Sequence, residues 1–322
     1  MSDAPTIGVD VGGTKVLGVV VDADGEVVAE VRRPTPLGGG AVVDAMVEVV
    51  AALRQEDAGR AATAVGAGVP GLVDRNGVLR GAPNLPGVTD LDVQSLGEAA
   101  TGLRWRVDND ATVALWGEHL LGAARGVADV ALVTLGTGIG GGLIAAGSLV
   151  RGAHGFAGEI GHMVVDVDGV VCVCGRSGCW ERYASGSGLG RLAREVADAG
   201  QGRAMVALAG GDPMAVRGEH VTRAAAEGDP DALALVDVFA DWFAVGLANL
   251  VQILDIERCV VGGGLVTASD VLLPPIVEAF GRRLGTPRQR PTVAIVPAEL
   301  GASAGAIGAA LLARDTERVA GT

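Results

Sequence analysis

Short apolar runs alternate with amphipathic stretches along the whole chain. Runs that end in glycine or in a polar turn predict strands at residues 6–10, 16–21, 26–31, 64–69, 105–107, 130–135, 139–145, 258–261 and 293–296. Apolar positions at helical spacing predict helices at residues 41–54, 111–121, 232–254, 272–284 and 303–313, with further helices between about 189 and 226. Strands that alternate with helices are typical of the α/β class.

One supersecondary pattern occurs twice. A strand, a turn rich in glycine and threonine, and a returning strand are found around Gly12-Gly13-Thr14 and again around Gly136-Thr137-Gly138. Repetition of this kind indicates a duplicated unit and therefore two lobes built alike. We expect a small lobe at residues 1–118, against which the C-terminal helix at about 303–322 packs, and a large lobe at residues 119–302.

Length, composition and charge narrow the class of protein. The chain has 322 residues, which suits two domains, and it is 49% hydrophobic but only 3% aromatic. A net charge of −13 speaks against nucleic acid or an anionic membrane as a partner. Residues 131–150 carry no charge, but their six glycines and strand–turn–strand pattern argue against a membrane helix. The first residues show no secretory signal, so we expect a cytoplasmic protein with reduced cysteines.

Four residues form a candidate metal site. Soft thiolates and one imidazole suit tetrahedral zinc, and they are supplied by His162, Cys172, Cys174 and Cys179. Gly175 and Gly178 would let the short loop fold back on itself. A disulfide or free buried thiols are the alternatives, which the reducing compartment and the ligand spacing disfavour. Zinc here would also fix two neighbouring carboxylates, Glu159 and Glu181, beside a polar pocket.

The two glycine turns are candidates for phosphate binding. The first is not a Walker loop, but its bare backbone N–H groups could approach phosphate oxygens closely. Asp10 ends the preceding strand, where it could hold a hydrated Mg²⁺. Either turn could also be a plain hairpin, although their pairing favours a phosphate chain. Gly262-Gly263-Gly264 follows a strand and suits a purine and ribose, or simply a tight turn into a helix.

Polar residues that follow strands are candidates for catalysis. Asp108-Asn109-Asp110 stands where open α/β sheets place their ligands, so one carboxylate could accept the proton of an attacking hydroxyl. The same residues could cap the next helix, and we expect one to cap and another to act as a base. Asn84 lies in a proline-stiffened loop and is either a hydroxyl-binding amide or an ordinary turn residue. Cys259 is read as a buried core thiol.

These motifs together resemble the ROK family of sugar kinases and repressors. The resemblance rests on the run from Asp10 to Lys15, on Asn109-Asp110, on Glu159-Ile160-Gly161-His162, and on the C-x-C-G-x-x-G-C-x-E run from Cys172 to Glu181. It extends from residue 6 to about residue 313 and is strongest to the ATP-dependent bacterial glucokinases of actinobacterial type. It implies the two-lobed actin-like ATPase (ribonuclease H-like) fold, with nucleotide and sugar between lobes that close.

The resemblance also implies residue roles. Asp110 would be the general base toward the sugar 6-hydroxyl, and the sugar would be bound by Asn84, Asn109, Asp110, Glu159, His162 and Glu181. ATP would be held by Asp10 with its Mg²⁺ and by Gly12, Gly13, Thr14, Lys15, Gly136, Thr137, Gly138, Gly262, Gly263 and Gly264. The zinc ion would be structural. Family members often read Asn-Asp-Ala-Asn where this chain has Thr112 in the last place, which affects the rim of the pocket.

The expected function is therefore that of a glucokinase, transferring the γ-phosphate of ATP to D-glucose. Kinases of N-acetylmannosamine, mannose or fructose are alternatives within the same class. A polyphosphate donor would call for a basic track, which the sequence lacks. A non-catalytic sugar-sensing regulator would carry an N-terminal helix-turn-helix, for which a phosphate hairpin starting at Thr6 leaves no room. The family leads us to expect a homodimer or a homotetramer.

Overall fold

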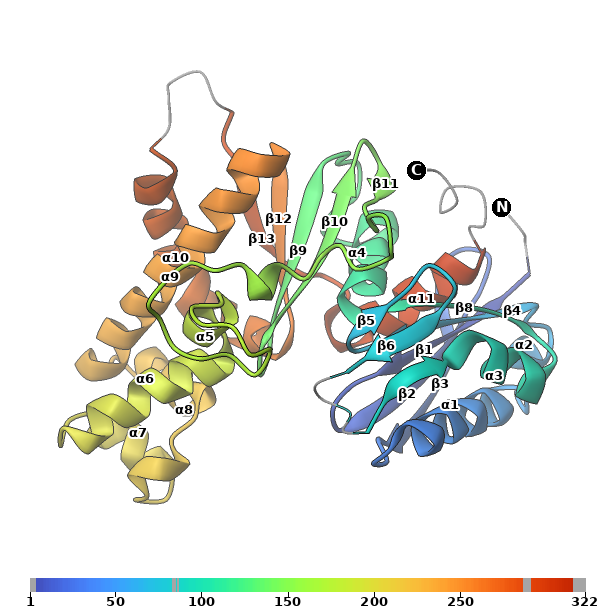
Figure 1. Ribbon diagram of the computed structural model, residues 1–322, viewed down its shortest axis with the longest axis horizontal. Coiled ribbons are helices and arrows are strands. Elements are labelled where there is room, and N and C mark those ends of the chain that lie inside the picture. The colour runs from blue at the N-terminus through green and yellow to red at the C-terminus, as the bar shows by residue number, and fades with distance from the viewer. Residues whose placement is uncertain (1–3, 83–84, 86, 286–290, 315–322) are drawn as a thin grey trace. The chain divides into compact units, whose positions relative to one another are not determined.

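The computed structural model describes residues 4–82, 85, 87–285 and 291–314 of the chain. The chain forms two compact units: unit 1 comprises Met1–Leu132, Gly142–Gly158 and Ala298–Thr322, and unit 2 comprises Val133–Gly141 and Glu159–Pro297. Helices and strands alternate in both, as the α/β class requires (Figure 1). The division into functional lobes at residues 1–118 and 119–302 stays a prediction.

The main sheet of unit 1 has the strand order β3-β2-β1-β4-β8. Its strands are β1 (Thr6–Val11), β2 (Lys15–Val21), β3 (Val27–Pro34), β4 (Ala64–Val69) and β8 (Arg104–Asn109). The first three form an antiparallel meander, whereas β4 runs parallel to β1 and β8 runs parallel to β4. The carboxyl ends of β1, β4 and β8 therefore meet at one edge of the sheet, which is where Asp10 and Asp110 come together.

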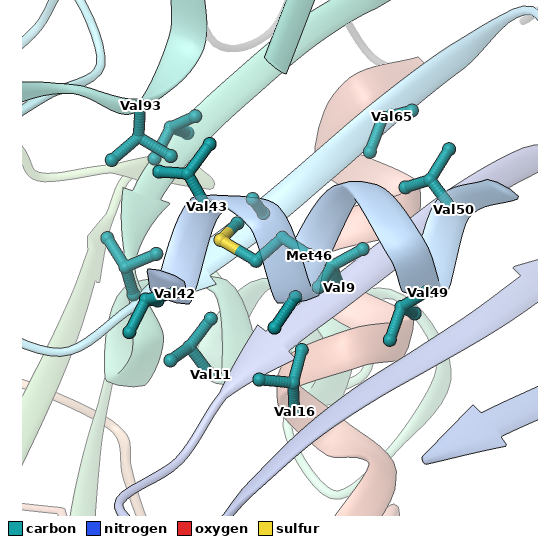
Figure 2. Packing of buried hydrophobic residues seen from close by; sticks show 14 of the residues in the cluster. Val9, Val11, Val16, Val42, Val43, Met46, Val49, Val50, Val65 and Val93 are labelled. Atoms are coloured by element: carbon teal, nitrogen blue, oxygen red, sulfur yellow. The ribbon is translucent and has the colours of Figure 1, made fainter. Parts of the chain in front are cut away.

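Helices cover both faces of this sheet. One face packs against α1 (Gly39–Leu53), where Met46 and a set of valines are fully buried (Figure 2). The opposite face packs against α11 (Ala304–Arg314), which also lies along α4 (Asp110–Leu121). A Cβ atom at Gly8 would stand 1.8 Å from the Ala306 carbonyl oxygen, so α11 approaches β1 so closely that only glycine fits there.

Unit 1 also contains elements that the apolar pattern did not predict. A three-stranded antiparallel sheet is formed by β5 (Leu72–Val73), β6 (Val78–Gly81) and β7 (Thr89–Asp92). The short helices are α2 (Asp57–Arg60) and α3 (Val93–Thr101). These strands are two to four residues long and polar in part, which is too short for a periodic signal.

The second sheet has the order β11-β10-β9-β12-β13. Its strands are β9 (Val130–Leu135), β10 (Ile139–Ala145), β11 (Ser148–Leu149), β12 (Arg258–Gly262) and β13 (Ala294–Pro297). The residues of β9 and β10 are divided between the two units, β11 belongs to unit 1, and β12 and β13 belong to unit 2. Each sheet thus begins at its edge with three successive strands in reverse order and ends with two later ones. This agreement matches the duplicated pattern in the sequence.

The rest of unit 2 is mainly helical, and its helices pack largely on one another. They are α5 (Glu181–Ala184), α6 (Gly186–Asp198), α7 (Arg203–Leu208), α8 (Gly218–Ala226), α9 (Pro230–Leu254) and α10 (Ser269–Leu284), which follows the 3-10 turn η3 (Gly264–Ala268). By length and composition α9 and the stretch Gly264–Leu284 would be long enough to cross a membrane. The apolar window of α9 is 61% buried inside the protein, as in a core helix, so this is weak evidence for a membrane.

Candidate active site

At the junction of β8 and α4, Asn109 caps the helix and Asp110 is its first residue. Asn109 is the N-cap of α4, where its Oδ1 accepts hydrogen bonds from the N–H groups of Ala111 at 2.9 Å and Thr112 at 3.2 Å. Its Nδ2 donates to the Gly71 carbonyl at 3.2 Å, which fixes the amide from the other side. The expectation that one residue of this run caps the helix is confirmed, and the adjacent Asp110 is left with its carboxylate at the first turn.

Asp110 and Asp10 form an acidic pair within unit 1. Burial raises the pKa of the Asp110 carboxyl above its usual value. Burial and then the charge of Asp110 raise the pKa of Asp10 to about 7, against the lowering effect of Lys15. A Cβ atom at Gly305 would lie 2.6 Å from the Asp10 carboxyl, so α11 presses directly on this side chain. Two carboxyl groups with raised pKa values at a sheet edge are typical of a catalytic or cation-binding site.

The first glycine turn, between β1 and β2, is tight and exposed. Gly12 donates its N–H to the Lys15 carbonyl at 2.8 Å, which closes the turn. Thr35 holds it from one side, because its Oγ1 donates to the Gly12 carbonyl at 2.7 Å and its N–H donates to the Thr14 carbonyl at 3.1 Å. A Cβ atom at Gly13 would meet nothing within 4 Å. The turn thus presents bare backbone to its surroundings, as phosphate binding requires.

The second glycine turn, between β9 and β10, has other segments of unit 2 close to it. The start of α6 docks on it, since Gly186 donates its N–H to the Gly136 carbonyl at 2.9 Å. A Cβ atom at Gly138 would stand 2.4 Å from a carboxylate oxygen of Glu181. Gly263 has φ 84° and lies against the backbone of Leu135, where its Cβ would be 2.5 Å from the carbonyl oxygen. The two candidate nucleotide segments of unit 2 and one candidate sugar ligand are therefore neighbours.

The cysteine cluster has the geometry of a metal site. The candidate ligand atoms of His162, Cys172, Cys174 and Cys179 all lie within 4.8 Å of one another. The sulfurs of Cys174 and Cys179 are 3.5 Å apart, and the Cys172 sulfur is 3.8 Å from Nδ1 of His162. Tetrahedral Zn–S bonds of about 2.3 Å place sulfurs about 3.8 Å apart, so the donor set fits zinc. The four cysteines of the chain are free.

Loop conformation explains how the cluster forms. Gly175 has φ 86° and Gly178 has φ 73°, the left-handed region that glycine tolerates, as the sequence predicted for a loop that folds back. Cys172 donates its N–H to the Arg176 carbonyl at 2.7 Å, and Gly175 donates to the Cys172 carbonyl at 3.0 Å. These backbone hydrogen bonds help to bring the sulfurs together.

The three thiols of the cluster differ in the direction in which their pKa values are shifted. Burial alone would raise the pKa of the Cys174 thiol, but hydrogen bonds from the backbone and side chain of Arg176, and then from the neighbouring thiols, lower it to about 6. Burial raises the pKa of Cys172 and of Cys179. The Cys172 thiol donates to Oε1 of Glu181 at 3.0 Å. A metal ion would displace these remaining protons, because thiols coordinate as thiolates.

Two carboxylates flank the imidazole of His162. Its Nδ1 lies 3.7 Å from Oε1 of Glu181, and its Nε2 lies 3.7 Å from Oε2 of Glu159. Nδ1 is also the nitrogen that faces Cys172, so Nε2 is the one left to face another ligand. This arrangement gives one ring nitrogen to the cluster and the other to a polar surface.

The loop that carries Cys172, Cys174 and Cys179 is anchored on α9 by Trp180, which the sequence analysis did not single out. Trp180 is fully buried, and its Nε1 donates to the Trp242 carbonyl at 2.8 Å. A Cβ atom at Gly246 would lie 2.1 Å from the indole ring, so only a glycine at this position of α9 leaves room for Trp180. In the sequence, this role could have been inferred from the position of Trp180 between Cys179 and Glu181. Trp180 therefore fixes the residues on either side of it.

The candidate residues divide between the units. Unit 1 carries Asp10, Gly12, Gly13, Thr14, Lys15, Asn109 and Asp110. Unit 2 carries Gly136, Thr137, Gly138, Glu159, His162, Cys172, Cys174, Cys179, Glu181, Gly262, Gly263 and Gly264. Asn84 lies outside the described residues. Thr112, the departure from the usual family pattern, is buried in the first turn of α4.

Comparison with known proteins gives one consistent result. Residues 6–316 match the ROK family. The chain is 41% identical to a glucokinase of Streptomyces coelicolor over 98% of this chain and 99% of that one. It is 34% identical to an N-acetylmannosamine kinase of Escherichia coli over 96% and 98%.

The solved structures extend this result to the fold. A ROK family glucokinase from Streptomyces griseus, determined in complex with glucose and AMPPNP, superimposes with a TM-score of 0.87 at 39% identity over 97% of this chain and 100% of that one. The likeness confirms the predicted actin-like ATPase (ribonuclease H-like) fold.

Proposed function

The chain belongs to the ROK family, and we propose that it is an ATP-dependent glucokinase, which transfers the γ-phosphate of ATP to the 6-hydroxyl of D-glucose. The observation that carries this proposal is the near full-length similarity to a glucokinase structure that holds both glucose and an ATP analogue. The acidic pair and both glycine turns of this chain, which such a reaction requires, are in place.

Asp110 is the proposed general base. It accepts the proton of the sugar 6-hydroxyl while that oxygen bonds to the γ-phosphorus and the bond to the bridging oxygen of ADP breaks. A carboxyl whose pKa is raised by burial is a stronger base than an exposed one, and at the first turn of α4 it is held rigidly. Positioning and charge stabilisation supply most of the rate in phosphoryl transfer.

The phosphates are bound, in this proposal, by backbone rather than by basic side chains. The N–H groups around Gly12, Gly13 and Thr14 and around Gly136, Thr137 and Gly138 face the phosphate oxygens, with Lys15 nearby and Gly262, Gly263 and Gly264 beside the nucleoside. Asp10 fits the role of holding hydrated Mg²⁺, because oxygen ligands suit that ion. Bound Mg²⁺ would neutralise charge on the transferred phosphate.

The sugar is bound, we propose, by Asn84, Asn109, Asp110, Glu159, His162 and Glu181. A structural zinc ion would be held by His162, Cys172, Cys174 and Cys179, and it would fix the orientation of the His162 imidazole, whose Nδ1 faces the cluster. Glu159 and Glu181 stand on either side of that ring and accept hydrogen bonds from sugar hydroxyls. The enzyme is further proposed to be cytoplasmic and to form a homodimer or homotetramer.

A coupled ADP-release assay with glucose, mannose, fructose and N-acetylmannosamine tests the function. We expect glucose to give the highest kcat/KM. Preference for N-acetylmannosamine is the second candidate, because relatives of about a third identity carry that activity in their names. Lack of ADP release with millimolar glucose would overturn the proposal, and gel filtration with light scattering tests the assembly.

A further inference from the structure

A small cavity in unit 1 is lined by an excess of positive charge. Its volume is about 150 Å³, and three arginines, Arg75, Arg106 and Arg151, line it with two aspartates, Asp74 and Asp108. They come from three parts of unit 1: the turn between β5 and β6, strand β8, and the loop after β11. Such convergence of guanidinium groups is unexpected in a chain of net charge −13.

Both aspartates are already engaged. Oδ2 of Asp108 accepts from Nε of Arg151 at 2.5 Å, in a pair that is largely buried. Oδ2 of Asp74 accepts from Nη2 of Arg80 at 2.6 Å. Each carboxylate is thus hydrogen-bonded to another arginine, and neither is hydrogen-bonded to the guanidinium of Arg106, the third arginine of the cavity.

Arg106 is the half-buried member without a bonded partner. Strand alternation places Arg104, Arg106 and Asp108 on the same face of β8. Within the described residues, no hydrogen bond or ion pair reaches the Arg106 side chain. Burial lowers the pKa of Arg106, and the positive charges of Arg151 and Arg104 lower it further, whereas Asp108 raises it. An arginine remains charged all the same, so the site holds like charges together at a cost in free energy.

We propose that this cavity binds a phosphate group, either free phosphate or the phosphate of a monoester. The guanidinium fork matches the oxygens of phosphate, and converging arginines are the usual way in which proteins recognise it. A volume of this size admits a tetrahedral oxyanion, as it admits several waters. This site lies outside the residues proposed to bind ATP and sugar.

An adjoining cavity has room for the organic part of a monoester. It has a volume of about 640 Å³ and shares Asp74 and Arg75 with the first. Leu72, Ala153 and Phe156 give it apolar walls. The first cavity also adjoins the carboxyl end of β8, because Asp108, which lines it, accepts a hydrogen bond at Oδ1 from the Asn109 N–H at 2.8 Å. A bound phosphate would therefore act on Arg151 and Asp108, next to the N-cap of α4.

Inorganic phosphate is the first probe, with binding measured by calorimetry and by thermal unfolding at constant ionic strength set with chloride. We expect saturable binding that raises Tm. Arg106→Gln should weaken it by about tenfold or more, because a charge-assisted pair of hydrogen bonds is lost. Arg33→Gln, at an exposed arginine on β3, is the matched control and should bind as the parent does. Arg106→Lys keeps the charge and should bind with intermediate affinity.

Glucose 6-phosphate is the second probe and separates the two sources. If glucose 6-phosphate binds more tightly than phosphate and Arg106→Gln abolishes this binding, the cavity is a site for a monoester. If the two ligands bind with equal affinity and both depend on Arg106, the cavity is a site for the phosphate group alone. Binding that is the same in the parent and in both Arg106 variants, or absent from the parent, overturns the proposal. Turnover is not measured, so this result is independent of the glucokinase assay.

Discussion

The acidic pair of unit 1 and the cysteine cluster of unit 2 hold their reactive groups in different ways. Asp10 and Asp110 stand at the ends of regular elements and are fixed by the close backbone packing of α11 and α4. The cluster is built on a loop with almost no regular structure, which backbone hydrogen bonds and Trp180 hold in place. The first arrangement needs the whole fold of unit 1, while the second needs a short loop anchored on α9.

Removal of the proposed base should have the largest effect. Asp110→Ala should lower kcat by about a thousandfold or more, since general-base catalysis and the rigid acceptor are both lost. Zinc content, measured by atomic absorption, should stay the same because the cluster lies in unit 2. An Asp110→Ala enzyme with near-normal turnover would refute its role. Thr112→Ala, which shortens a buried side chain in the same turn of α4, serves as a control for disturbed packing there.

Loss of one sulfur ligand should come next. Cys174→Ser should release zinc and raise the KM for glucose by about tenfold or more, because His162 loses its anchor. The KM for ATP should change much less. Cys259→Ala removes the buried thiol outside the cluster and should keep its zinc. Should zinc leave while the glucose KM holds, the metal has no part in sugar binding.

The two glycine turns should respond differently to one methyl group. Gly138→Ala places a Cβ atom 2.4 Å from Glu181, so that carboxylate must move and the KM for glucose should rise about tenfold. Gly13→Ala meets nothing within 4 Å, so the fold tolerates it, but the methyl covers backbone proposed to face phosphate and the KM for ATP should rise. Steady-state kinetics with both substrates measures this, and identical changes in the two variants would contradict the assignment.

The pH dependence of stability should reveal the buried acid of unit 1. The folded-state pKa of Asp10 is about 7 against 3.8 for the free side chain, so the folded protein binds the extra proton between these values. Stability therefore falls as pH rises from about 4 to 7, and the penalty is complete above 7. Asp10→Asn should raise the unfolding free energy of the metal-free protein at pH 8, by an amount on the order of a few kcal/mol, with little change at pH 4.

Urea unfolding at the two pH values measures this effect. A stability gain of equal size at pH 4 and pH 8 would show that packing, not ionisation, is responsible. Since the charge of Asp110 contributes to the raised pKa, Asp110→Asn should reduce the gain from Asp10→Asn.

Local sequence signals predicted the features that local chemistry determines. Strands β9 and β10 lie at the predicted residues, because apolar runs bounded by Gly136-Thr137-Gly138 leave little freedom. The cysteine spacing likewise indicated one cluster. Contacts between distant segments could not be predicted. The ion pair of Arg151 with Asp108 and the close approach of Gly305 to Asp10 are two examples, and the residues next to them in sequence give no sign of either contact.

The environment of one buried carboxylate could not be predicted from the sequence either. Glu118 is fully buried at the end of α4, and its oxygens accept hydrogen bonds from the N–H groups of Ala123, Glu299 and Leu300. In the sequence it is an ordinary polar residue of an amphipathic helix. Ala123 is a local donor, but only the return of the chain before α11 adds the other two. Three backbone donors make the burial of this carboxylate tolerable.

The position of α11 also affects how the protein can be made. Thr6 in β1 donates through Oγ1 to the Ala310 carbonyl at 2.9 Å, across 304 positions of sequence. At ordinary rates of translation, tens of seconds separate the synthesis of these two residues. During that time one face of the first sheet lacks its covering helix, while residues 159–297 of unit 2 are being synthesised. Unit 1 can therefore complete its fold only after that whole segment of unit 2 has been made.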